Sequence, residues 1–78
     1  MMNDKELLEL AAKAAGVKSG PFWNPLIYDG DALRLAINLD IDVAKVQIKF
    51  WDKHSINPYA ATRRAIVRAA AEIGKEKK

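Results

Sequence analysis

Few side chains in this sequence could carry out catalysis. His54 is the sole histidine, cysteine is absent, and Ser19 and Ser55 are the only serines. His54 and Ser55 are adjacent, and adjacent residues rarely reach the geometry in which a base activates a nucleophile. The absence of cysteine also excludes disulfides and cysteine-ligated zinc. We therefore expect no catalytic residue and no enzymatic activity.

Two short acidic pairs could in principle bind a metal ion. They are Asp29 with Asp31, and Asp40 with Asp42. A calcium-binding loop needs ligand oxygens at several further positions and a late glutamate, which these stretches lack. A helix N-terminus that begins at Asp29 explains the first pair without an ion. The sequence therefore predicts no metal site and no cofactor.

The basic residues are concentrated in the second half of the chain. Residues 1–42 carry four basic and seven acidic side chains, a net −3, whereas residues 43–78 carry nine basic and three acidic ones, a net +6. This asymmetry indicates either complementary halves or an anionic partner. The candidate basic surface is Arg63, Arg64, Arg68, Lys45, Lys49 and Lys53. Four aromatic side chains could supply contacts to a partner: Phe22, Trp23, Trp51 and Tyr59.

Three segments have helical patterns. Residues 3–15 start with Asn3 as an N-cap, carry an apolar stripe, and end at Gly16. Residues 30–39 fit either an alternating strand or a largely buried helix, and we favour the helix. Residues 58–73 follow an Asn-Pro start and carry a stripe that includes Ile66 and Ile73. Between the first two, residues 17–28 hold two prolines and three aromatic residues, which predicts a loop packed over the core.

Residues 42–52 alternate apolar and polar side chains, which predicts a strand. A single strand leaves backbone groups unpaired, and no tight turn indicates a second strand nearby. Pairing of this strand around residues 44–52 with a second copy of the chain would satisfy those groups. The sequence thus predicts a homodimer with the strand at its centre.

Three stretches resemble a known family: NDKELLELAAKAAG, WNP followed by DGDALRLAINL, and PYAATRRAIVRAAAEIG. They resemble the phage ABA-sandwich domain, a group of small bacteriophage and prophage proteins. The resemblance implies a phage origin and helices packed against a small sheet, and it implies no activity or functional residue. Members of the group often have a longer middle section than the one between residues 39 and 58 here.

These observations predict one α+β domain over residues 1–78, with three helices on a small antiparallel sheet that a second chain completes. No apolar run reaches the roughly 18 residues that a membrane span needs, and the first residues do not resemble a signal peptide. We expect a non-enzymatic phage accessory protein in the bacterial cytoplasm that binds an unidentified protein partner. The alternative is nucleic-acid binding through the basic half.

Overall fold

The computed structural model describes residues 3–18, 20, 22–50 and 57–76 of the 78-residue chain. Within these ranges the secondary structure is α-helical, apart from one isolated bridge between Gly20 and Trp23. The helices are α1 (Asp4–Ala15), α2 (Asp29–Asn38), α3 (Val43–Lys49) and α4 (Pro58–Glu76). Three of them, α1, α2 and α4, lie where the sequence predicts helices.

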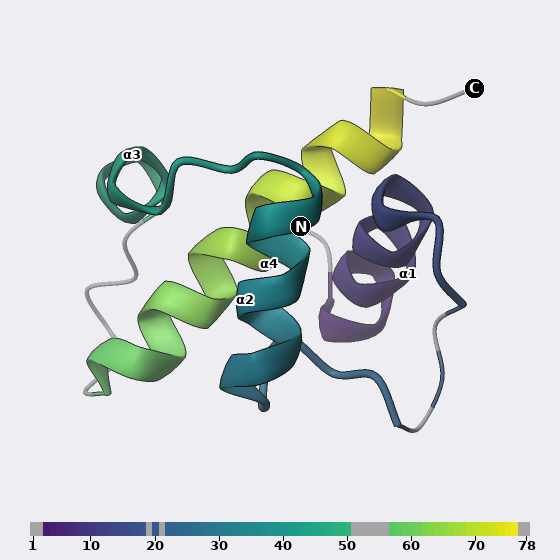
Figure 1. Cartoon of the computed structure of the whole chain (residues 1–78), viewed down its shortest axis with the longest axis horizontal. Helices are drawn as coiled ribbons and strands as arrows, with labels where there is room; N and C mark the ends of the chain where they lie inside the picture. Colours follow the sequence, from purple (N-terminus) through teal and green to yellow (C-terminus); the bar gives the residue numbers. More distant parts are fainter. Residues whose placement is uncertain (1–2, 19, 21, 51–56, 77–78) are drawn as a thin grey trace.

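The long helix α4 organises the molecule (Figure 1). It runs diagonally behind α2, and α1 packs along its C-terminal half. Helix α3, seen end-on in Figure 1, also contacts α4. Each of the other helices therefore contacts α4, which makes α4 the common support for the fold.

The predicted ends of two helices are present as capping contacts. The Asn3 side chain accepts a hydrogen bond from the Glu6 N–H at 2.8 Å, which starts α1. Gly16 ends α1 in the left-handed conformation with φ of 72°. The Asn57 side chain accepts a hydrogen bond from the Tyr59 N–H at 2.9 Å at the start of α4. Local sequence is therefore sufficient to fix these three boundaries.

The prediction of a strand over residues 42–52 is wrong for the part that the structure describes. Asp42 accepts a hydrogen bond from the Lys45 N–H at 3.2 Å and caps α3. Val43 and Val46, three residues apart, pack against the core as a helical period requires. Ile48, which the alternating pattern placed with Val46, is instead 85% exposed. The same apolar residues fit both periods, and contact with α4 selects the helical one.

The α+β sandwich prediction is therefore corrected to an all-helical fold for the described residues. The small sheet that the family resemblance implied is absent from them. A homodimer held by strand pairing around residues 44–52 loses its physical basis over residues 43–49, because these residues form the helix α3 and present no strand edge. A second copy would have to bind elsewhere on the surface.

Small side chains dominate the core. Among the residues that the structure describes, nine of the thirteen buried hydrophobic residues are alanines, and the other four are Leu7, Leu35, Ile66 and Val67. Alanines allow the helix backbones to approach closely, as at Gly74, where an added Cβ would lie 2.0 Å from the Leu10 carbonyl oxygen. The fully buried part of the core thus contains few large apolar groups, and larger side chains such as Trp23, Leu26 and Leu39 pack against it only partly buried.

The aromatic loop before α2 is only partly packed. Trp23 and Leu26 lie against the core, as predicted for this segment. Phe22 does not, because its side chain is 94% exposed. The prediction of a loop that covers the core therefore holds for Trp23 and is wrong for Phe22.

Candidate functional site

Arg63 is the most deeply buried of the five predicted basic residues within the described ranges, with a side chain only 16% exposed. Its Nε donates a hydrogen bond to the Leu26 carbonyl oxygen at 2.9 Å, and its Nη1 lies 2.5 Å from Asp29 Oδ1. One guanidinium therefore joins α4 to the loop and the first residue of α2. The planar guanidinium group of arginine can donate two such hydrogen bonds in different directions, which the single ammonium group of lysine does not do with the same fixed geometry.

The other two arginines of α4 contact different neighbours. Arg64 Nη2 lies 2.8 Å from Asp4 Oδ1, at the start of α1. Arg68 lies over the ring of Phe50, with 5.4 Å from its Cζ to the ring centroid. The same ring also contacts the ammonium group of Lys49 at 5.2 Å. Lys49 in turn lies 3.7 Å from a Glu72 carboxylate oxygen.

The predicted basic surface is therefore divided rather than continuous. Arg63 turns toward α2, Arg64 toward α1, and Arg68 toward the end of α3. Lys45 is exposed on α3. Lys53 and Trp51, with His54 and Ser55, lie outside the described residues. The arginines of α4 act mainly as links between helices.

The predicted aromatic contacts also separate. Phe22 is exposed on the loop, and Trp23 is half-buried against the core. Tyr59 is 69% exposed at the start of α4. Of these three, Tyr59 alone lines the surface groove described next.

An open groove of about 350 Å³ lies where α2, α3 and α4 meet. Its apolar walls come from all three helices: Ala32 and Leu33 from α2, Val43 from α3, and Tyr59 and Ile66 from α4. Asp29, Thr62 and Arg63 supply its polar groups. The ion pair between Asp29 and Arg63 therefore occupies the groove wall, and the remaining surface is apolar.

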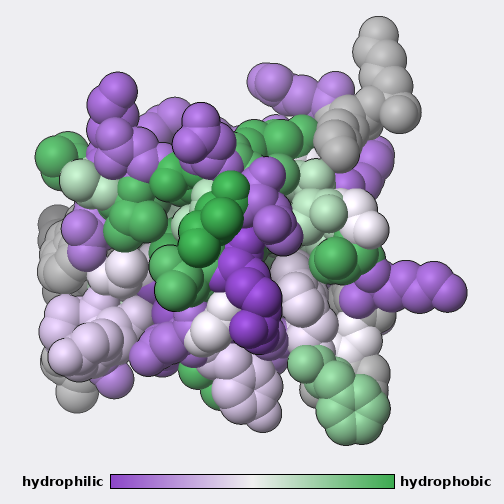
Figure 2. Space-filling view, viewed as in Figure 1, coloured by the Kyte–Doolittle hydropathy of each residue, from purple (hydrophilic) through white to green (hydrophobic). Residues whose placement is uncertain are grey.

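Large apolar side chains extend from this groove over the outside of α2. Leu33 is 59% exposed and Ile37, one turn further on, is 67% exposed. Together with Tyr59 on the opposite wall they form what we call the apolar face (Leu33, Ile37 and Tyr59). Figure 2 shows hydrophobic surface over the middle of this view, bordered by hydrophilic side chains. Exposed apolar groups gathered in this way mark contact surfaces.

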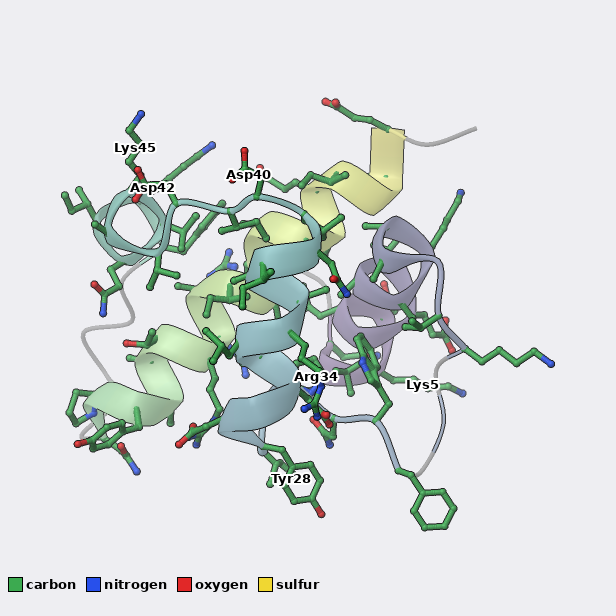
Figure 3. The ribbon with its side chains drawn as sticks, in the orientation of Figure 1. Lys5, Tyr28, Arg34, Asp40, Asp42 and Lys45 are labelled. Atoms are coloured by element: carbon green, nitrogen blue, oxygen red, sulfur yellow. The ribbon has the colours of Figure 1, made fainter. Side chains whose placement is uncertain are left out.

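Asp31 has a role that sequence reasoning missed. It lies in the first turn of α2, as the sequence indicates, and its side chain is also almost fully buried. One carboxylate oxygen accepts a hydrogen bond from the Asn24 N–H at 3.0 Å, and the other contacts Arg34 Nη2 at 2.7 Å. Figure 3 shows Arg34 beside the first half of α2. The Asn24 hydrogen bond, and secondly Arg34, hold the pKa of Asp31 below its ordinary value.

The hydrogen bond from the Asn24 N–H to Asp31 joins the aromatic loop to α2, and these two residues are seven positions apart in the sequence. The Asn24 side chain also accepts a hydrogen bond from the Leu26 N–H at 3.1 Å, which closes an Asx turn before the helix. The signal available in the sequence was the spacing of Asn24-Pro25 and Asp31. The Asp31 cluster therefore positions α2, and with it the apolar face.

Two other kinds of functional feature, a metal site and a membrane-spanning helix, can be checked against the described residues. Among the described residues, no three or more acidic, histidine or cysteine side chains gather where they could hold a metal ion. Nor does any helix in the described ranges combine the length and apolar character that crossing a bilayer demands. Neither observation adds a site to the groove and the apolar face.

Comparison of the chain with protein-family models, curated proteins and solved structures finds no match in any of the three. The geometry of the described residues is therefore the basis for assigning a function.

Proposed function

We propose that the chain is a non-enzymatic protein-interaction domain that binds through the apolar face. The observation that carries this proposal is the exposure of three large apolar side chains: Leu33 and Tyr59, which line one open groove, and Ile37, one turn beyond Leu33 on α2. Burial of such side chains is the dominant favourable contribution to most protein association. Aromatic side chains such as Tyr59 are also enriched at the centres of interfaces.

The rigid support of the apolar face favours the same function. Leu35 and Ala36 hold α2 in the core at 2% and 3% exposure, so neighbouring Leu33 and Ile37 are presented by a fixed helix. Asp31 and Arg63 attach the start of α2 to the loop and to α4. A preordered contact surface loses less conformational entropy on binding.

Nucleic-acid binding is a second candidate, for a reason other than the predicted basic surface. Helix α3 is seen end-on in Figure 1 while α2 lies across the view, and residues 39–42 connect them. Asp40 in this turn has a positive φ of 53°. Two crossed helices joined by a short turn also occur in helix-turn-helix proteins, whose second helix enters the major groove.

The charges on α3 support this second candidate weakly. Figure 3 shows Lys45 and the acidic N-cap residue Asp42 on the outside of α3, and the apolar Ile48 on the same helix is 85% exposed. A phosphate-binding surface requires clustered positive charge. Arg63 and Arg64 turn away from α3, and the one arginine beside it, Arg68, shares the Phe50 ring with Lys49, which is paired with Glu72. The protein-interaction proposal is therefore the better supported of the two.

Site-specific photo-crosslinking tests the proposal. A benzophenone amino acid replaces Ile37 in one variant and Ile48 in another, since both isoleucines are exposed but only Ile37 belongs to the apolar face, whereas Ile48 lies on α3. Irradiation of cells that produce the protein should yield a discrete protein adduct at position 37 and none at position 48. Equal labelling at both positions, or no adduct at position 37, would exclude the apolar face as a binding surface.

The origin and compartment are further parts of this proposal. The resemblance to phage and prophage proteins suggests a phage-encoded accessory protein that acts in the bacterial cytoplasm. The partner's identity would come from the mass of the adduct.

A further inference from the structure

The three large side chains of the apolar face stand out against the composition of the core. Most buried hydrophobic residues are alanines, whereas Leu33, Ile37 and Tyr59 are 59–69% exposed. Small domains with a limited core usually require a disulfide, a metal or association with another chain. The sequence has no cysteine. A partner that covers the apolar face would supply the burial of large side chains that the core does not provide.

We propose that this partner is a second copy of the chain, and that the two α2 helices pack against each other about a two-fold axis. This inference rests on the proposed function and names the occupant of the same face. Leu33 and Ile37 are four residues apart, so they form one ridge on the outside of α2. An antiparallel second α2 presents the same ridge, which makes the contact self-complementary.

The size of the apolar face fits a dimer. At about 200 Å² for a fully exposed large side chain, its three residues expose about 400 Å² together. A stable interface buries about 800 Å² on each partner, of which a little over half is apolar. For this chain that amounts to about 15% of its 5485 Å² of accessible surface. The apolar face therefore provides most of the apolar part of one standard interface, and the surrounding polar side chains provide the rest.

The charges beside the apolar face also suit a second copy. Asp29 is paired with Arg63 at 2.5 Å, and Arg34 with Asp31 at 2.7 Å. The charges at the start of the ridge therefore already have opposite charges within the chain, and the exposed Asp40 lies beyond its other end. The paired charges limit like-charge repulsion between two copies and do not select a strongly acidic or basic partner.

Sedimentation equilibrium of the purified protein and two matched variants tests the dimer. Ile37→Glu places a charge on the ridge, and Ile48→Glu places the same charge at an exposed isoleucine of α3 that lies outside the groove. At about 100 μM, wild type and Ile48→Glu should both have a mass near twice 8.7 kDa. Ile37→Glu should sediment near 8.7 kDa, with a dimer Kd raised at least about a hundredfold, since the substitution occurs twice in a two-fold interface.

Circular dichroism of each variant confirms that it is folded, and Leu33→Lys provides a second change on the ridge. A wild-type mass of 8.7 kDa at 100 μM would overturn the dimer proposal. The proposal would also fail if both ridge variants remained dimeric, or if Ile48→Glu became monomeric. A monomer that still forms an adduct with a different protein at position 37 overturns the dimer but leaves the protein-interaction function standing. A monomer with no adduct overturns both.

Discussion

Gly74 is the position at which the packing of α1 on α4 can be tested most sharply. In most helices, replacement of an interior glycine by alanine stabilises the protein by up to about 1 kcal/mol, because alanine loses less backbone entropy on folding. At Gly74 we expect the opposite sign. A Cβ at this position would lie 2.0 Å from the Leu10 carbonyl oxygen and 2.8 Å from its carbonyl carbon.

The size of the effect follows from what must move. The obstructing atoms belong to the backbone of α1, so no side chain can rotate away, and the two helices must separate locally by about 1.5 Å to reach an ordinary contact distance. A gap of that size forfeits about half or more of the dispersion energy of the atoms that line it. Overpacking of this kind costs about 1–3 kcal/mol, which exceeds the gain in helix propensity. We expect a net loss of about 1–2 kcal/mol.

Urea unfolding followed by circular dichroism measures this loss, and Gly30→Ala is the control. At Gly30 the nearest atoms to a new Cβ are the flexible guanidinium nitrogens of Arg34 at 3.5 Å or more, an ordinary contact. We expect Gly30→Ala to be neutral or stabilising by about 0.5 kcal/mol. If Gly74→Ala is as stable as wild type, or more stable, then α1 and α4 are not in the close contact described here.

Three further outcomes are expected. Because the pKa of Asp31 is lowered in the folded state, its carboxylate stabilises the fold at pH values above its ordinary pKa of 3.8, and this contribution is lost as the pH falls below that value. Urea unfolding should therefore show that Asp31→Asn is less stable than wild type at neutral pH and that its stability depends less on acid pH. In thermal unfolding, Arg63→Met should cost about 1–2 kcal/mol and Arg64→Met less than about 0.5 kcal/mol, since the Arg64 pair is more exposed; equal costs would refute the linking role of Arg63. Fluorescence anisotropy with a labelled DNA duplex in physiological salt should show no binding tighter than about 10 μM, and tighter, salt-dependent binding would favour the second candidate function.

Local sequence signals determined much of the fold. The Asn3 and Asn57 caps and the left-handed Gly16 were readable, because capping depends on residues within one turn. The strand prediction failed because the same segment fits two patterns. A helical period joins Val43, Val46 and Phe50, whereas an alternating pattern joins Val46, Ile48 and Phe50. Contact with α4, which is distant in sequence, decides between these two patterns.

The candidate site was harder to predict for the same reason. The partners of Arg63 and Arg64 lie 34 and 60 residues away in sequence, so a cluster of basic letters in α4 could not show that its members turn to different helices. The apolar face combines α2 with the start of α4, and the exposure of Leu33 was not visible in a segment interpreted as largely buried. Only the three-dimensional arrangement shows which apolar residues the core leaves uncovered.

A concentration series of ¹H–¹⁵N NMR spectra tests the central claim most directly, since it locates the dimer interface residue by residue. From about 10 μM to 1 mM, the amide signals of Leu33, Ile37 and Tyr59 should shift together along one binding curve. The signals of Lys45 and Ile48 on α3 should remain unchanged. Shifts confined to α3, or spectra that do not change with concentration, would contradict self-association through the apolar face.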